Sequence, residues 1–489
     1  MLRGAAVGAC ALAALAFASP RVAAADKPRI ADNHFSLDLF QGPILAPISI
    51  MGVAGAYSAY AEGISGFVSN AASPGVRDPF SFSNPDWDVS ASISIPIPLF
   101  QNDDFDDSGS RDQNFTNFIY VTAGALVQVG QLGFGVDGEL QRYTLSASDG
   151  SASTAVYVGK FHALGALRLL GDQLVVGAGA RVVFLTFDVP GPNLTQAGVS
   201  PEVGFLIRPD WQPFRVGATF RAPVDGQSFL GAATSVDASG VKRAGDLVLP
   251  EKVVEPWELQ MGVAVQVGPR PLNPKWIDPD AQDNALKARV EGQKRLRQRA
   301  AREELAAIAD PVARELRKVE IDAAESRALD ADARVLSEGL AALDRERRAR
   351  YANWPREHLL LLFDVVLTGP VANGVSIQRF LGQNDASTDA SAPPNYIGTS
   401  GARVSFSPRL GVETEPLPDL VHTRAGSYYE PARYTDRDIG RQHFTFGADL
   451  KLFRTSWFGL VRPVYYKLQT SGDFAARYQS VSLGLGVWH

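Results

Sequence analysis

The stretch MGVAGAYSAYAEGISGFVSNAASPGVR, residues 51–77, differs in composition from the rest of the chain. It is rich in Gly, Ala and Ser, and Glu62 and Arg77 are its only ionised side chains. Its glycines weaken any long helix, since each costs roughly 0.5–1 kcal/mol relative to Ala. We expect a short helix over residues 54–61 and a turn over residues 70–74. The stretch is too apolar for a solvated linker, so it is either a Gly-rich loop of a soluble β protein or a plug enclosed by a barrel.

The first 25 residues have the pattern of a secretory signal. Arg3 supplies the basic end, residues 5–18 the apolar core and residues 23–25 the small-residue cleavage site. Cys10, the only cysteine, lies inside this leader, where VGAC also resembles a lipoprotein box. The exported chain is then expected to have no disulfide and no cysteine-based zinc site. No later stretch offers about 18 consecutive apolar residues, so a membrane-bound form would have to cross as strands.

After the plug, apolar residues alternate one by one with small or polar residues. From residue 257 to 267, Trp, Leu, Met and Val occupy every second position, with Glu, Gln, Gly and Ala between them. A period of two places the two sets on opposite faces of a strand. The second set, here and elsewhere, is Gly, Ser, Gln and scattered charge, which is typical of a barrel lumen with lipid outside. We therefore expect arginine to be costly at the lipid-facing Val263 and mild at the lumen-facing Gln260.

Fourteen such runs follow one another, an even number as in single-chain bacterial barrels. They cover residues 86–98, 117–129, 131–145, 155–169, 173–188, 198–208, 213–221, 251–268, 357–368, 401–415, 421–430, 441–453, 458–469 and 478–489. Since backbone polar groups in lipid must all be paired, the sheet has to close. The connections alternate between short and long, as expected of periplasmic turns and outer loops. The alternation holds along the whole list if the C-terminus is periplasmic.

The connection between the eighth and ninth runs, residues 281–356, has a different composition. It carries 17 Lys/Arg and 14 Asp/Glu among 76 residues, and its Ala, Leu, Glu and Arg favour helix. Asp310 followed by Pro311 is the signal of a helix N-cap with Pro at the first helical position. We expect helices over residues 281–309 and 312–351, packed as an antiparallel coiled coil in the periplasm.

The apolar positions expected in the seam of this coiled coil are Leu286, Val290, Leu305, Ile308, Leu316, Val319, Leu336, Leu340 and Leu343. The insertion is either a solvated charged spacer or a docking arm for another envelope protein.

The chain resembles the FadL/OmpP1/TodX family of outer-membrane transport proteins for hydrophobic compounds. The stretch GVAGAYSAYAEGISGFVSNAASPGVR is similar to that family's N-terminal hatch, and HTRAGSYYEP and RQHFTFGADLKL are similar to its C-terminal strands. With the fourteen strands, the resemblance covers nearly all of the exported chain except residues 281–356. Two features depart from the family: Asn70-Ala71-Ala72 replaces Asn-Pro-Ala in the hatch, and Trp488-His489 replaces the terminal aromatic residue.

The resemblance implies a lumen closed by the hatch, binding of long-chain hydrophobic ligands and their release through a gap where one strand kinks. The third run, with Gly133, Gly135 and Gly138, is a candidate for that kink because interior Gly marks bends.

No catalytic constellation, metal site or cofactor is expected. The six His residues show no H-x-x-x-H or HExxH spacing, and no G-x-S-x-G is present, so we expect the histidines to be hydrogen-bonded residues of the wall. The acidic run 103–112 holds half a calcium loop, but Phe115 stands where a bidentate Glu should be. A solvated outer loop that bridges to lipopolysaccharide phosphates through divalent ions is favoured there. The net charge of −6 gives no reason to expect nucleic acid.

Candidate functional positions fall into two groups. The plug and gating positions are Gly52, Gly55, Ala56, Ala59, Gly66 and Asn70. Charges in the lumen are expected to pair with one another or with the plug, because an unpaired buried charge is costly. Arg181, Arg409 and Lys451 could instead hold a ligand carboxylate.

The sequence thus predicts an all-β fold, a 14-stranded antiparallel transmembrane β-barrel with an N-terminal luminal plug and an inserted periplasmic α-helical hairpin. Its parts are a signal peptide (1–25), the plug (26–85), strands one to eight (86–280), the helical insertion (281–356) and strands nine to fourteen (357–489). The expected function is passive transport of hydrophobic small molecules, such as long-chain fatty acids or aromatic hydrocarbons, across the bacterial outer membrane. The alternatives are a non-transporting barrel that acts in secretion or envelope organisation through residues 281–356, and a polar porin, which a plug disfavours.

Overall fold

The computed structural model describes residues 30–82, 84–95, 107, 113–147, 153–188, 194–226, 235–245, 247–381, 383, 399–434, 439–455 and 464–488. The expected signal peptide and most of the acidic run 103–112 therefore lie outside the described residues.

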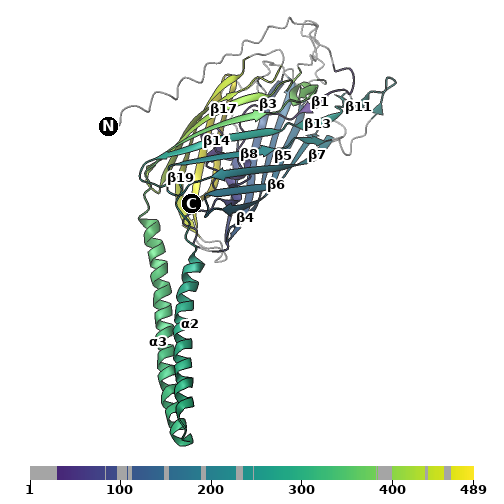
Figure 1. The fold of residues 1–489 in the computed structure, drawn as a ribbon. Coiled ribbons are helices and arrows are strands. Elements are labelled where there is room, and N and C mark those ends of the chain that lie inside the picture. Colours follow the sequence, from purple (N-terminus) through teal and green to yellow (C-terminus); the bar gives the residue numbers. More distant parts are fainter. Residues whose placement is uncertain are drawn as a thin grey trace.

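Fourteen antiparallel strands form one sheet that nearly closes into a barrel (Figure 1). They are β2 (Asp86–Ser94), β3 (Gln113–Val129), β4 (Leu132–Ala147), β5 (Ser153–Leu169), β6 (Leu174–Asp188), β7 (Leu194–Ile207), β8 (Phe214–Arg221), β14 (Glu258–Val267), β15 (Leu359–Thr368), β17 (Ser405–Leu417), β18 (Val421–Glu430), β19 (Arg441–Thr455), β20 (Val464–Ala475) and β21 (Tyr478–Trp488). Each pairs with the next in this order. The two end strands lie alongside each other, since a Cβ built at Gly484 of β21 lies 3.4 Å from that of Ser92 on β2. The predicted strand number and antiparallel order are confirmed.

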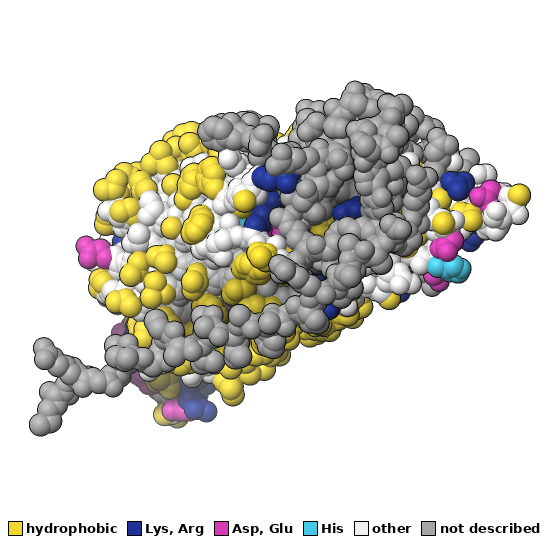
Figure 2. Space-filling view, turned by 90° about the horizontal axis from the view of Figure 1, so that it is seen from above, with side chains coloured by type: hydrophobic (Ala, Val, Ile, Leu, Met, Phe, Trp, Pro, Cys, Tyr) yellow, Lys and Arg dark blue, Asp and Glu magenta, His cyan; other side chains and the backbone are white. Residues whose placement is uncertain are grey.

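The side chains face as the period of two predicted. On β14, Met261, Val263 and Val265 are exposed, whereas Gln260 and Ala264 are buried. Seen from above, hydrophobic side chains spread over the outer wall of the barrel (Figure 2). An apolar outer surface around a lumen face of Gly, Ser, Gln and charge is the arrangement of a barrel that stands in lipid.

The two ends of the barrel differ. The tight turns at residues 170–173 and 418–420 lie at the end from which two helices project, which we call the hairpin end (Figure 1). The indole Nε1 of Trp488 donates to Asp419 at 3.3 Å, so the C-terminus is at this end too. The longer connections 222–257 and 369–404 lie at the opposite end, the loop end. The predicted placement of the insertion on the side of the C-terminus therefore agrees with the structure.

The strict alternation of connection lengths is wrong at one place. β20 spans residues 464–475 instead of the expected 458–469, so only Ala476 and Arg477 connect it to β21 at the loop end. The polar lumen face continues past Gln469 with the buried Ser471 and Asp473, and the chain turns only where Arg477 takes a φ of 60°. The preceding connection, 456–463, lies outside the described residues.

Residues 35–77 run inside the barrel, and we call them the N-terminal segment. Its helical parts are α1 (Ile48–Gly52) and two 3-10 turns, η1 (Ile64–Val68) and η2 (Ser73–Gly75). The helix expected over residues 54–61 is wrong, because Ala54, Gly55 and Ala61 have φ values of 55°, 69° and 46°. Such left-handed residues interrupt a helix, so the helical turn lies upstream. The turn expected over residues 70–74 is present, with the Ser73 amide donating to the Asn70 carbonyl at 2.9 Å.

Short elements cover the loop end. A four-stranded sheet has the order β16 (Gly374–Ser376), β1 (Ser36–Asp38), β13 (Lys252–Glu255), β9 (Val224–Gly226). β10 (Ser235–Val236), β11 (Lys242–Ala244) and β12 (Leu247–Val248) form a second sheet, and α4 (Ile377–Leu381) follows β16. Their apolar side chains pack with the inner faces of β3–β7 into one large buried cluster. We call this the apolar chamber; its members include Leu37, Val158, Leu185, Phe187 and Phe380.

Two helices, α2 (Pro279–Ala307) and α3 (Pro311–Ala352), form a hairpin that projects away from the barrel (Figure 1). The predicted cap is confirmed: the Asp310 carboxylate accepts hydrogen bonds from the amides of Val312 and Ala313 at 3.2 and 3.3 Å. Asp278 caps α2 in the same way. No helix in the described ranges is both long enough and apolar enough to cross a bilayer.

Charged pairs hold much of this hairpin together. Arg297 of α2 lies 3.4 Å from Glu325 and bonds Asp332 of α3, and the hydrogen bond to Asp332 raises the pKa of Arg297. Near the tip, Arg317 faces Glu304 at 2.7 Å. Because Arg317 takes the place facing α2, the expectation that Leu316 and Val319 lie in the seam is wrong; they are 67% and 62% exposed.

The base of the hairpin packs on the end of the N-terminal segment and on the residues that follow it in the chain. The Phe80 ring lies 5.0 Å from that of Tyr351 and 4.7 Å from that of Trp354, between ring centroids. The Arg77 guanidinium lies 3.8 Å from the ring centroid of Trp276. We call these five residues the aromatic joint.

Candidate functional site: the filled lumen

Glycines of the wall form a belt where the N-terminal segment touches it. A Cβ at Gly411 would lie 2.7 Å from the Val53 carbonyl oxygen, and one at Gly447 would lie 3.1 Å from the Gly52 Cα. The same close approach to the segment occurs at Gly133, Gly177, Gly204, Gly217 and Gly426. A side chain at these positions would displace the backbone of the segment, so only glycine lets it lie this close to the wall.

Polar side chains of the wall bond the backbone of the segment. Asp364 accepts the Ser58 amide at 2.9 Å, and Gln260 donates to the Gly55 carbonyl at 3.1 Å and to Asp364 at 2.7 Å. Arg409 lies 3.5 Å from the same Gly55 carbonyl. Gln260 faces the lumen as expected and its amide holds the segment; that arginine is mild there stays a prediction.

Asn70 links two turns of the segment to β7. Its amide donates to the Ser58 carbonyl at 2.7 Å and to the Phe205 carbonyl at 3.0 Å. Its side-chain oxygen accepts the Ala72 amide at 2.9 Å. These three bonds hold the turn at Ala71. This is the position at which the FadL/OmpP1/TodX family has Pro.

Two arginines of β8 hold the segment and were not singled out from the sequence. The buried Arg215 donates to the Tyr60 carbonyl at 2.9 Å and the Leu272 carbonyl at 2.6 Å. Arg221 donates to the Val68 carbonyl at 2.6 Å. Arg215 also pairs with Glu62 of the segment at 2.8 Å, and Arg221 pairs with Glu258 of the wall. Bonds to backbone carbonyls have no signature in sequence, so only the place of these arginines on a lumen face could have suggested their role.

All six plug and gating positions lie in the segment and are buried: Gly52, Gly55, Ala56, Ala59, Gly66 and Asn70. Gly52 and Gly55 lie against wall residues, whereas Gly66 packs on Ser73 and Ala61 of the segment itself. Their part in gating stays a prediction.

The three candidate partners of a ligand carboxylate do not converge. Arg181 donates to the Ala222 carbonyl at 3.1 Å, and Arg409 faces Gly55. Lys451 bonds Asp419 at 2.7 Å, at the hairpin end. Each already contacts the protein, which fits lumen charges that pair with one another or with the segment. Their role toward a carboxylate stays a prediction.

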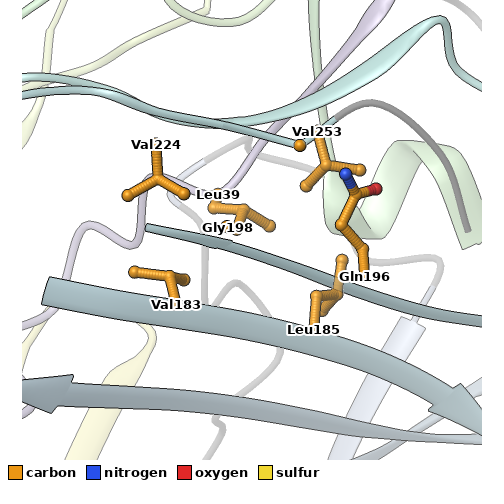
Figure 3. Close-up of a pocket in the computed structure, with 8 residues that line it drawn as sticks. Leu39, Val183, Leu185, Gln196, Gly198, Val224 and Val253 are labelled. Carbon is orange, nitrogen blue, oxygen red and sulfur yellow. The ribbon is translucent and has the colours of Figure 1, made fainter. Parts of the chain in front are cut away.

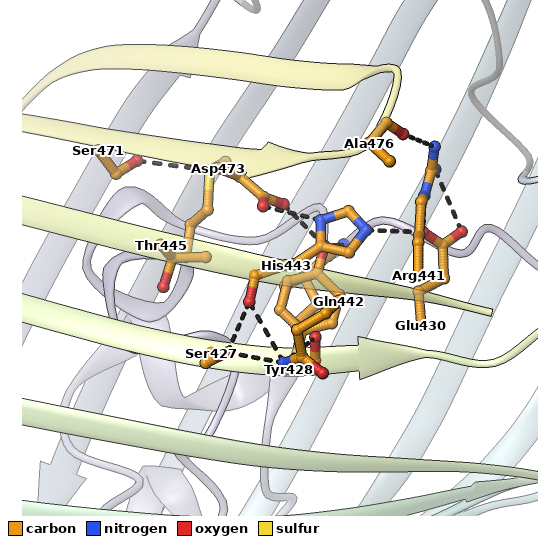
Figure 4. Close-up of polar contacts among 12 residues, drawn as sticks. Ser427, Tyr428, Glu430, Arg441, Gln442, His443, Thr445, Ser471, Asp473 and Ala476 are labelled. Carbon is orange, nitrogen blue, oxygen red and sulfur yellow. Dashed lines mark hydrogen bonds and ion pairs between the residues drawn. The ribbon is translucent and has the colours of Figure 1, made fainter.

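The histidine with the most polar contacts is a wall residue. The two ring nitrogens of His443 lie 2.8 Å from Asp473 and 2.7 Å from Glu430 (Figure 4). The Tyr428 hydroxyl donates to Asp473 at 2.7 Å and accepts the Ile44 amide at 3.1 Å. Both ring nitrogens of His443 are bonded to carboxylates of the wall. The cluster holds the segment through the bond of Tyr428 to the Ile44 amide.

The third strand is not kinked at its glycines. β4 pairs without a register shift with β5 from Leu132 to Ser146 and with β3 from Leu132 to Arg142. Gly133 and Gly135 instead make room for the Pro74 carbonyl and the Phe67 ring. The expected kink is therefore wrong for this strand, because its glycines serve close packing.

Within the described ranges, no group of three or more His, Cys, Asp or Glu side chains could hold a metal ion. The half calcium loop at 103–112 lies outside them except for Asp107.

No protein-family model and no curated protein matches the chain. Among solved structures, a CymD monoaromatic hydrocarbon channel shares 10% identity over 91% of this chain and 96% of its own, with a TM-score of 0.44. A TodX deltaS2S3 mutant monoaromatic hydrocarbon channel shares 11% identity over 91% and 98%, with a TM-score of 0.42. OpdL of Pseudomonas aeruginosa shares 10% over 82% and 96%, with a TM-score of 0.26. These values do not assign a family, so the resemblance to the FadL/OmpP1/TodX family stays a prediction.

Proposed function

We propose that the chain is an outer-membrane barrel that lets hydrophobic small molecules, such as long-chain fatty acids or aromatic hydrocarbons, pass without an energy source. In this proposal residues 1–25 are removed on export, residues 26–85 act as a luminal plug, lipid and lipopolysaccharide surround the wall, and residues 281–356 stand in the periplasm. The apolar outer face and the filled lumen support it.

One observation carries the proposal: on β5 and β6 the inner wall changes from polar to apolar toward the loop end. On β5, His162 and Lys160 give way to Val158 and Val156, all on the lumen face. On β6, Arg181 gives way to Val183, Leu185 and Phe187. An apolar chamber above a filled lumen suits a cargo that gains free energy from burial, and it disfavours a polar porin.

The test compares uptake of labelled palmitate, toluene and glucose by cells that express the chain and by cells that lack it. We expect faster uptake of palmitate or toluene and unchanged uptake of glucose. Leu185→Asp places an unpaired charge in the chamber and should remove the gain, whereas the volume-conserving Leu185→Met should keep it. Faster uptake of glucose alone would contradict the proposal.

A second role, attachment of another envelope protein, is favoured by an apolar stripe on the hairpin. Val312, Leu316 and Val319 follow the i, i+4, i+7 spacing of one helix face and are each more than 60% exposed. Replacing residues 288–338 with a short Gly-rich turn removes the stripe but keeps the aromatic joint and the ion pair of Asp283 with Arg347 (2.7 Å). If this variant still transports its cargo but no longer binds an envelope protein, the second role is supported. If it no longer transports, the hairpin is needed for transport.

A further inference from the structure

The two ends of the filled lumen are closed in different ways. At the loop end, apolar side chains of the wall and of the short sheet lie against one another: Val183 and Leu185 of β6 face Val224 and Val253, with no room for a cargo molecule between them (Figure 3). At the hairpin end, a single stretch of chain, residues 269–278, leads from the end of β14 to the start of α2. We call this stretch the α2 root.

The α2 root spans the mouth of the barrel. It begins at the end of β14, and at its other end the Asp278 carboxylate accepts the Asn84 side-chain amide at 3.4 Å, two residues before β2. β2 is the first and β14 the eighth of the fourteen strands, so they lie on opposite sides of the barrel. The root therefore crosses the end of the lumen that the N-terminal segment fills.

The first half of the root is firmly bonded to the wall. Asn273 is 1% exposed, and its side-chain nitrogen lies 3.0, 3.0 and 2.9 Å from the backbone carbonyls of Pro209, Gln212 and Phe214. Its side-chain oxygen accepts the Nε of Arg215 at 2.7 Å. Asn273 therefore anchors the root beside the turn between β7 and β8.

The second half of the root is held by weaker contacts, most of them made by Trp276. Its ring centroid lies 3.8 Å from the guanidinium carbon of Arg77 and 5.3 Å from that of Arg168. Its indole nitrogen donates to the Ser81 carbonyl at 3.1 Å, and its two neighbours in the chain are exposed. Cation–π contacts and single hydrogen bonds are each weak, so Trp276 can leave this place without breaking a strand ladder.

The hairpin is tightly joined to this second half. α2 starts directly after Asp278. Arg347 of α3 donates to the Pro279 carbonyl at 2.9 Å and lies 2.7 Å from Asp283 of α2. Because α3 is fastened to the first turn of α2, the two helices and Trp276 move together when the hairpin moves.

We propose that the α2 root is a gate at the hairpin end of the lumen, and that movement of the hairpin opens it. The chain pivots between Asn273 and Trp276, and Trp276, Tyr351 and Trp354 leave Arg77 and Phe80 together. The end of the N-terminal segment then loses the contacts that hold it at this mouth. This inference rests on the proposed function and adds to it the step that limits passage, the opening of this gate.

The test fastens the gate shut. Asn84→Cys combined with Asp278→Cys places two thiols across it, and the chain has no cysteine beyond residue 10, so a short reducible cross-linker joins only this pair within the chain. Uptake of labelled toluene and palmitate is measured in cells before cross-linking, after it, and after reduction. We expect uptake to slow several-fold on cross-linking and to recover on reduction. Comparison within one variant cancels the effect of losing the Asp278 cap.

A matched pair joins the two helices to each other instead of to the chain before β2. A Cβ at Gly339 lies 3.7 Å from the Leu286 Cγ, so Leu286→Cys with Gly339→Cys can be cross-linked within the hairpin and should leave uptake unchanged. Trp276→Ala needs no cross-linker and covers the case in which the first pair fails to fold. It should speed uptake, whereas Ile277→Ala, at an exposed neighbour, should not.

Uptake that is equally fast with the gate joined and free overturns the inference, as does equal slowing by both cross-links. A Trp276→Ala variant that is no faster than the unaltered chain also overturns it. The proposed function has a separate readout. If the unaltered chain takes up toluene or palmitate and the joined gate does so equally fast, only the gate is wrong. If the unaltered chain takes up neither compound above the level of cells without it, the proposed function fails as well.

Discussion

The N-terminal segment and the helical hairpin both lack a hydrophobic core of their own, but they are stabilised in different ways. The segment is almost uncharged, and its backbone is held by wall residues such as Gln260, Arg215 and Asp364. The hairpin has 31 charged residues among the 76 of the insertion and projects away from the barrel (Figure 1). A chain of small residues needs an enclosure, because it buries little area per residue, whereas charged helix formers satisfy their backbone internally. The predictions below test this difference.

The largest effect is expected from removing the enclosed element. Deletion of residues 51–70 should leave the strand ladder intact and open the lumen, so single-channel conductance should rise by more than about tenfold, as in a barrel with a water-filled interior. The matched control is the hairpin shortened by residues 288–338, whose conductance should stay unchanged. An unchanged conductance in the plug deletion would show that the segment does not block the lumen.

Arginine substitutions on the two faces of β14 should have different effects, one on the stability of the barrel and the other on the segment inside it. Val263→Arg faces outward and should cost roughly 2–4 kcal/mol near the midplane of a bilayer, seen as a lower temperature of the gel-mobility shift on heating. Gln260→Arg should shift this temperature less but should loosen the segment and raise conductance, because it removes bonds to Gly55 and Asp364. The same temperature shift and the same conductance in both variants would contradict the assigned faces.

A single added side chain should crowd the lumen. Gly55 has a φ of 69°, and a Cβ there would lie 2.6 Å from the Arg409 Nη1 and 2.9 Å from the Ile44 Cδ1. Gly55→Leu should therefore slow uptake of toluene or palmitate several-fold while the heating shift of the barrel changes little. Ala59→Ser, a small change in the same segment, serves as the control. Uptake as fast as in the unaltered chain would remove Gly55 from the passage.

The smallest effect is expected in the hairpin. Asp310→Ala removes the cap of α3 and should destabilise the first turn by about 1 kcal/mol. Hydrogen exchange of the amides of Val312 and Ala313 should speed up accordingly, with transport unchanged. Asp330→Ala, within the same helix, should leave these two amides as they were. A loss of transport on Asp310→Ala would mean that the hairpin tip takes part in passage.

The barrel could be predicted because each strand repeats one local rule, and the exposed Val263 and buried Gln260 obey it. The short strands β1, β9 and β16 could not, since three residues are too few to show a period. The helix of the segment was misplaced because the left-handed φ of Ala54 is imposed by packing rather than by its residue type. The point at which β8 stops pairing with β7 could not be predicted either, because no alternation of residues records it.

The aromatic joint connects the base of the hairpin to the chain just after the N-terminal segment. α3 has 42 residues, so its arm is about 60 Å long at 1.5 Å per residue. Its base meets Phe80, only a few residues from the η2 turn of the segment. A protein that moved the hairpin would therefore act on the residues next to the segment that fills the lumen, without entering the barrel.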